Sequence, residues 1–252
     1  MRRFRSLVIL LCASTFVIAS RPMASDESEQ QQYEGSLGTS SIGMTLLHTG
    51  SRIDGGHYFY QKFLQDIPLS GKMESSEITL NEPDGSIFHL HFIGNGSEGG
   101  HPLDFNNSVG MRGTWTNAKG TRSYKVSLHG TEIRPGRDEG RRYADVTSES
   151  DEKFETRVQH FVRSVETGNK DEALLFITYP LRVNYPDRTN KLFRTRTEVL
   201  DHWNEVFTPA LLSHLRRDLP HDMFVHEGNA MLGDGDFWFD SKGLVAVNLP
   251  RN

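Results

Sequence analysis

The hydrophobic alternation in "SIFHLHFIG", residues 86–94, restricts the fold of this chain more than any other feature. Phe88, Leu90 and Phe92 share one face of an extended segment, and the two histidines between them share the other, as in a half-buried strand. Short apolar runs separated by glycine-containing turns continue this rhythm through residues 33–133. We therefore expect an antiparallel β domain there, closed into a small barrel or bent into a sandwich.

The hydrophobic period changes from two to about 3.6 residues after position 152. Apolar residues recur at helical spacing over 154–165, and Thr195 with Glu198 has the spacing of a capping box before a second helix. The later runs "YPLRVNY", "DMFVHE", "DFWFD" and "GLVAVNL" are rich in β-branched and aromatic residues, which favours short strands. Residues 153–252 are thus predicted to form an α+β domain, helices first.

A charged segment separates the two patterns. Residues 134–152, "RPGRDEGRRYADVTSESDE", contain glycines and few aliphatic side chains, which indicates a linker between compact units. Residues 26–32, "DESEQQQ", lack an apolar period and are interpreted as a flexible leader. We expect a two-domain chain whose fold begins near Tyr33.

The first 25 residues have the organisation of a secretory signal peptide. Three arginines precede an apolar run from Leu7 to Ala19, followed by small residues. Cleavage is expected between Ser20 and Glu27, giving a periplasmic or secreted protein. The apolar run is short for a membrane span, and an uncleaved anchor is the alternative to cleavage. The single cysteine, Cys12, lies within this segment, so the mature chain is expected to have no disulfide.

Net charge argues against one class of partner. The formal net charge is -5, which gives no bulk positive field to hold a phosphate backbone. We therefore expect no nucleic-acid partner. The basic clusters lie beside acidic residues and are interpreted as solvated surface.

The stretch "MFVHEGNAMLGDGDFWF", residues 223–239, raises the question of a metal loop. Phe and Trp residues after Asp234 and Asp236 interrupt the alternating oxygen ligands that a calcium loop needs. His226 lacks the second histidine of a metalloprotease helix. We interpret the stretch as a hairpin turn, with glycines at positive φ and the aspartates in solvent.

The histidines of the β domain offer a second metal hypothesis. His89 and His91 point the same way along one predicted strand, so they would chelate a transition metal if a third ligand such as His57 approached. Exposed strand histidines explain the pattern more simply. No metal and no cofactor are predicted.

The order of elements over residues 152–250 resembles the cone-shaped α+β fold of the nuclear transport factor 2 (NTF2-like, or cystatin-like) superfamily. The segments that carry the resemblance are "YPLRVNY", "FTPALLSHL", "MLGDGDFWF" and "LVAVN". The resemblance implies a pocket between a curved sheet and its helices. The residues that would line or approach this pocket are Tyr179, Arg182, Trp203, Phe207 and Trp238. The two tryptophans also fit a simple core role, and Arg182 fits a surface role.

The β half is similar to a glycine-rich β domain of exported bacterial proteins, through "GGHYFYQKF", "IPLSGKM" and "GMRGTW". Neither resemblance specifies a reaction. The leading functional hypothesis is an exported, cofactor-free protein that binds a protein, an envelope component or a small ligand. An enzyme, hydrolase or isomerase, using His226 or Asp236 in the cone is the alternative, and a structural envelope assembly factor is a third.

Overall fold

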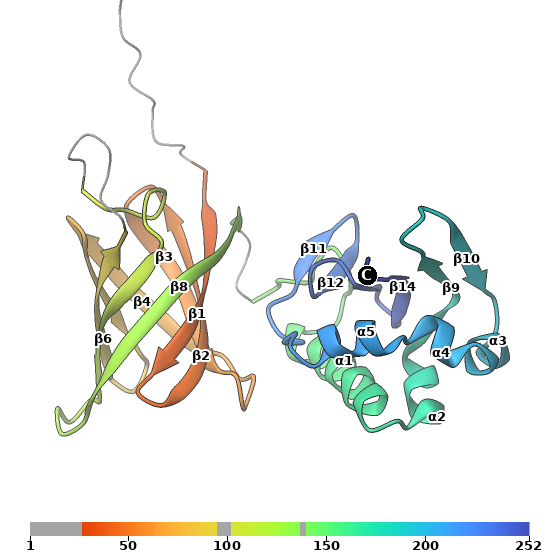
Figure 1. Ribbon diagram of the computed structural model, residues 1–252. Helices are drawn as coiled ribbons and strands as arrows, with labels where there is room; N and C mark the ends of the chain where they lie inside the picture. Colours follow the sequence, from red (N-terminus) through yellow and green to blue (C-terminus); the bar gives the residue numbers. More distant parts are fainter. Residues whose placement is uncertain (1–26, 95–101, 137–139, 252) are drawn as a thin grey trace, which may run out of the picture.

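The computed structural model describes residues 27–94, 102–136 and 140–251. The chain forms two units, a barrel and an α+β unit (Figure 1). The predicted signal peptide, residues 1–25, lies outside the described residues. Within the described ranges, no helix has both the length and the apolar character needed to cross a bilayer.

The first unit is a closed barrel of eight antiparallel strands in chain order, with the first strand paired to the last. The closed form decides between the two β architectures expected from the sequence, in favour of the barrel. The strands are β1 (Glu29–Leu37), β2 (Ser40–Thr49), β3 (Arg52–Tyr60), β4 (Ile67–Glu74), β5 (Glu77–Asn81), β6 (Ile87–Ile93), β7 (Gly110–Thr116) and β8 (Ser123–Pro135).

The alternation of β6 is confirmed. Phe88, Leu90 and Phe92 are buried in the barrel core, whereas His89 and His91 face solvent. The register pairs Leu90 with Ile78 on β5 and with Gly113 on β7. Aliphatic and aromatic side chains from all the strands fill the barrel interior, as expected for a barrel of this size.

The leader interpretation of residues 26–32 is wrong from residue 29 onward. Strand β1 begins at Glu29, and Gln30 and Gln31 are buried. Pairing with β2 and β8 satisfies the backbone of this polar segment. A run without apolar side chains can therefore form a strand when both neighbours supply hydrogen bonds.

The second unit combines a mixed six-stranded sheet with short helices. Its sheet order is β10-β9-β14-β13-β12-β11, and only β9 and β14 are parallel among its described pairs. The helices are α1 (Asp151–Glu166), α2 (Lys170–Ala173), the 3-10 turn η1 (Leu174–Phe176), α3 (Arg196–Asp201), α4 (Trp203–Val206) and α5 (Pro209–Leu215). The strands are β9 (Ile177–Asn184), β10 (Asn190–Phe193), β11 (Phe224–His226), β12 (Asn229–Leu232), β13 (Phe237–Phe239) and β14 (Leu244–Asn248).

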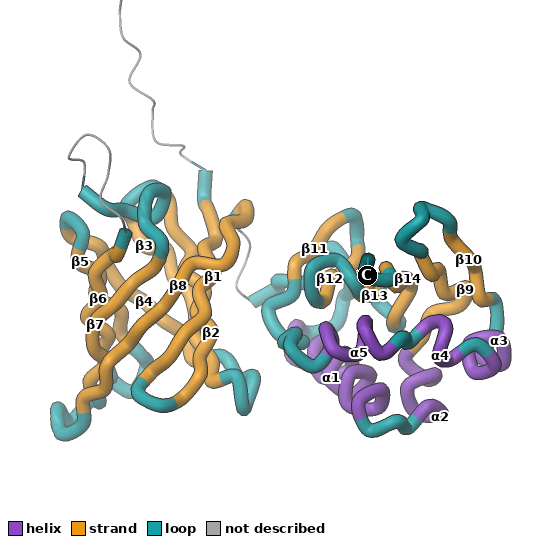
Figure 2. Tube along the Cα trace, viewed as in Figure 1, coloured by secondary structure: helices purple, strands orange, loops and turns teal. Residues whose placement is uncertain are grey.

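The helices of this unit lie together on one side of the sheet (Figure 2). Helix α1 buries Phe154, Val158 and Phe161, as its period predicted. Thr195 caps α3 by accepting a hydrogen bond from the Glu198 backbone, so the predicted start is confirmed.

The stretch 223–239 forms two connected hairpins rather than a metal loop. Gly228, Gly233 and Gly235 all have positive φ, as expected for tight turns. The prediction that both aspartates face solvent is wrong for Asp236, which is buried.

The segment 134–152 differs from an exposed linker at both ends. Arg134 and Pro135 belong to β8. Tyr143 and Val146 are buried in the core of the second unit. The carboxylate of Asp151 accepts hydrogen bonds from the backbone of Arg142 and Tyr143, which fixes this part of the chain against α1.

The barrel core predicts the effect of a single truncation on β6. Leu90→Ala should lower the free energy of unfolding by about 2–5 kcal/mol, because a fully buried side chain leaves a cavity. His91→Ala, one residue further along the strand, should change it by less than about 0.5 kcal/mol. Urea denaturation of both variants measures the difference, and equal losses would contradict the assigned faces.

Candidate ligand-binding site at the junction of the two units

The second unit packs against the outside of the barrel at strands β1 to β3. Along β2, residues 42–46 are buried without alternation, so both faces of this strand are covered. Thr45 and His57 point outward from the barrel, and both are almost inaccessible to solvent. Phe59 contacts the imidazole of His221 from the second unit, with ring centroids 4.3 Å apart. A polar surface of the barrel is therefore buried.

A single guanidinium connects the two units. Arg142 Nη1 lies 2.6 Å from Asp66 Oδ2, on the loop before β4 of the barrel. Its Nη2 lies 3.3 Å from Glu155 Oε1 on α1, and its Nε lies 3.5 Å from Asp222 Oδ1. The Arg142 side chain is only 6% exposed. We call Asp66, Arg142, Glu155, His221 and Asp222, with His57 and Thr45, the junction network.

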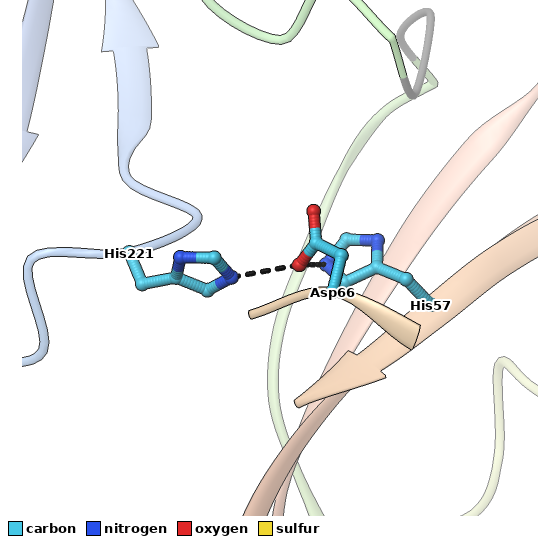
Figure 3. A group of neighbouring side chains, drawn as sticks. All are labelled: His57, Asp66 and His221. Atoms are coloured by element: carbon cyan, nitrogen blue, oxygen red, sulfur yellow. Dashed lines mark hydrogen bonds and ion pairs between the residues drawn. The ribbon is translucent and has the colours of Figure 1, made fainter. Parts of the chain in front are cut away.

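His221 bridges two carboxylates of this network. Its Nε2 lies 2.8 Å from Asp66 Oδ1, and its Nδ1 lies 2.6 Å from Glu155 Oε2. Asp66 therefore lies between the imidazoles of His221 and His57, whose Nε2 is 3.5 Å from the same oxygen (Figure 3). Both histidine side chains are almost completely buried.

Asp222, the residue after His221, contacts three side chains of the barrel. Its carboxylate accepts hydrogen bonds from Thr45 and, at 3.0 Å, from Gln32 Nε2, and it lies 3.4 Å from His57 Nε2. The backbone φ of Asp222 is 52°, a left-handed conformation that aspartate tolerates better than most residues. Its backbone N–H donates to Glu155 Oε1 at 2.9 Å, which helps to hold this turn in place.

The buried tyrosine Tyr143 completes the polar contacts around Glu155. Its hydroxyl donates to Glu155 Oε1 at 2.6 Å and accepts from the backbone N–H of Met223 at 2.8 Å. The segment 134–152, predicted to be a linker, thus supplies both Arg142 and Tyr143 to one buried site. Every carboxylate of the network has at least one charged or hydrogen-bonding partner, as buried charges require.

The network shifts the proton affinities of its members. Burial alone would lower the pKa of His221, but the carboxylates of Asp66 and Glu155 outweigh burial and raise this pKa to about 9. Burial would raise the pKa of Asp66 and Asp222, yet hydrogen bonds and nearby cations hold both well below the usual range. The pKa of Tyr143 is raised by burial. The carboxylates are therefore ionised and His221 is charged at neutral pH.

Two clefts flank the network. The larger, which we call the α1 cleft, has a volume of about 580 Å³ and lies between residues 63–66 of the barrel and the first two turns of α1. The smaller has a volume of about 230 Å³ and lies between β1 and β2 of the barrel and residues 217–223. His221 lines both clefts.

The five residues implied by the NTF2-like resemblance are spread over helix α4, its C-cap and strands β9 and β13. Trp203 and Phe207 are buried in the core beneath the helices, and Tyr179 packs against the same core. Arg182 and Trp238 alternate with buried neighbours and therefore face the other side. None of the five lines either of the two junction clefts.

The other sequence candidates are also separated. His226 is exposed beside Glu227, and Asp236 is paired with His214 Nδ1 at 2.8 Å. His57, considered above as a third ligand for the exposed β6 histidines, contacts Asp66 and Asp222 instead. His221 and Asp222 are neighbours in the sequence, and their side chains contact different partners within one network.

Sequence reasoning missed Asp66, Arg142 and Glu155. The one available signal was the pair of polar residues at outward positions of β3 and β2, His57 and Thr45, within runs of apolar neighbours. Polar side chains in such a setting indicate a covered surface, but they do not identify the partner segment.

Removal of the bridging guanidinium should strongly destabilise the chain. Arg142→Gln leaves the buried carboxylates of Glu155 and Asp222, and the partly exposed one of Asp66, with less compensation, so the free energy of unfolding should fall by about 3–5 kcal/mol. Arg52→Gln removes an arginine from an exposed pair with Asp54 and should leave the melting temperature almost unchanged. Thermal and urea unfolding measure both, and equal effects would contradict a central role for Arg142.

Asp218, on the wall of the smaller cleft, should impose a measurable pH dependence. Burial raises its pKa to about 6, Asp236 and Asp234 add to the shift, and His214 and Arg217 oppose it. The folded-state pKa exceeds the ordinary aspartate pKa of 3.8, so the folded state binds this proton more tightly. This contribution to stability is therefore lost as pH rises from about 4 to about 6.

Asp218→Asn should remove that loss, because an amide does not ionise. The variant's melting temperature relative to wild type should be higher at pH 7.5 than at pH 4. The exposed Asp201→Asn variant serves as the control and should follow wild type at both values. The same melting difference at both pH values for Asp218→Asn would show that its carboxyl is not perturbed.

Comparison with known proteins adds no relative. No protein-family model, curated protein or solved structure matches the chain. Inferences about function therefore rest on the junction network, its clefts and the sequence pattern.

Proposed function

We propose that the chain is an exported binding protein that holds a small cationic ligand in the α1 cleft. The observation that best supports this proposal is the net negative charge of the residues that line the α1 cleft. Four carboxylates, those of Asp66, Asp151, Glu152 and Glu155, face two cations, the side chains of Arg142 and His221. The excess negative charge in a partly enclosed cleft attracts a cation and repels an anion.

The size of the cleft supports a small ligand rather than a protein partner. Its volume of about 580 Å³ lies within the usual range for ligand pockets. Phe63 is 62% exposed on the same wall and offers an apolar surface to the ligand's carbon chain. Glu152 is exposed on the first turn of α1 and provides a carboxylate outside the junction network.

Export is proposed from the charged start, apolar run and small residues of positions 1–25. For the second unit we propose the NTF2-like cone. The long helix that precedes the sheet and the short helices on one face support this fold. The binding site, however, is proposed at the junction rather than in the cone.

A titration with spermidine as a cationic probe tests the function. Isothermal titration calorimetry should detect binding of spermidine but not of citrate. Glu152→Gln should weaken spermidine binding about fivefold, the effect of one charge at about 4 Å in water. Glu166→Gln, an exposed glutamate in the last turn of the same helix, is the matched control and should bind as wild type.

Two outcomes would contradict this function. One is equal binding of spermidine and citrate, or none of either. The other is an equal loss of spermidine affinity in Glu152→Gln and Glu166→Gln, which would assign binding to the overall charge of the chain rather than to the α1 cleft.

A further inference from the structure

Three side chains of the junction network bring metal-ligating atoms together. One ligand atom each from His57, Asp66 and His221 lies within 4.8 Å of the other two. Asp66 Oδ1 is 2.8 Å from His221 Nε2 and 3.5 Å from His57 Nε2 (Figure 3). The three residues come from β3, the loop before β4 and the segment after α5, so only the folded chain assembles them.

These separations, which suit direct hydrogen bonds and ion pairs, also match the spacing of ligands around one ion. Zinc bonds of about 2.1 Å place two ligand atoms about 3.0 Å apart at a right angle and about 3.4 Å apart at the tetrahedral angle. The observed 2.8 and 3.5 Å lie close to these two values. Entry of an ion therefore needs side-chain shifts of a few tenths of an ångström for the two measured pairs.

The surroundings orient the ligands as metal sites require. Glu155 Oε2 lies 2.6 Å from His221 Nδ1, so Nε2 is the nitrogen directed at Asp66. A carboxylate on the second ring nitrogen is the common outer partner of a metal-bound histidine. Arg142 Nη1 holds Asp66 Oδ2 at 2.6 Å, which leaves Oδ1 facing the imidazoles.

Charge balance also favours a dication. The carboxylates of Asp66, Glu155 and Asp222 exceed the charge of Arg142 by two. A divalent ion that displaces the proton from His221 Nε2 into solvent binds two neutral imidazoles and balances this excess without further groups. Two imidazoles and one carboxylate suit zinc and other late first-row metals, whereas calcium and magnesium prefer all-oxygen sites.

We propose that His57, Asp66 and His221 form a binding site for one divalent transition-metal ion, best suited to Zn²⁺. The site does not depend on the spermidine-type ligand proposed above. Asp66 and His221 also line the α1 cleft, so the proposed site borders that cleft. The ion would join the barrel to the second unit through direct bonds.

Calorimetry with ZnCl₂ on the full chain, first stripped with EDTA, tests the site. Wild type should bind one ion per chain. Asp66→Asn and His57→Gln should each weaken this binding at least about 100-fold, because each removes a ligand whereas outer partners alone account for 10–100-fold. Far-ultraviolet circular dichroism in metal-free buffer checks that each variant is folded.

The chain supplies a matched control in the exposed pair of histidines on β6. The double variant His89→Ala/His91→Ala removes an alternative chelating pair and should retain wild-type affinity and stoichiometry. Glu152→Gln should also bind Zn²⁺ as wild type, which separates this site from the spermidine site. Loss of the tight ion in the β6 double variant would overturn the proposal.

If Asp66→Asn and His57→Gln do not fold, a second measurement tests the site without them. In the β6 double variant, nitrogen-15 NMR of the imidazoles should show the resonances of His57 and His221 shifting with the first equivalent of Zn²⁺. Unshifted resonances of these two histidines, or the absence of stoichiometric binding by wild type, would show that the junction is an ion network only.

Discussion

The contact between Arg142 and its three carboxylates is the constraint on which the arrangement of the two units depends. Asp66 belongs to the barrel, Glu155 to α1 and Asp222 to the turn before β11, so one side chain fixes three segments. Desolvation of these charges is costly, and the cost is offset only in the docked geometry. The network therefore favours the docked arrangement, in which each of these charges has its partner.

The barrel is adapted to this contact on its outer surface. Three consecutive residues of β3 are buried. Tyr58 points into the barrel core, whereas His57 and Phe59 point outward and are covered by the second unit. The barrel core and the second core remain separate apolar clusters. Two cores joined by polar contacts produce clefts at their border, and the proposed ligand site occupies one of them.

Local patterns predicted the local structure and little of the junction. Period-two alternation identified β6, and the helical period identified α1, because each pattern reports burial against the chain's own unit. Arg142, in contrast, stands in a charged run whose composition is that of a linker, and its partner Asp66 lies 76 residues away. Asp222 needs a positive φ to place His221 and itself toward different partners, which sequence spacing does not reveal. Contacts between units depend on three-dimensional placement rather than on period.

The proposed ligands come from both units, so binding of a cation depends on the docking of the units. Asp66 and His57 belong to the barrel, whereas His221 and Glu155 belong to the second unit, so a cation held by both sets bonds only to the docked form. By mass action, any species that binds one arrangement stabilises that arrangement in proportion to its affinity and concentration. A cation bound at the junction therefore stabilises the docked arrangement. Its removal weakens the contacts between the barrel and the second unit that create its site.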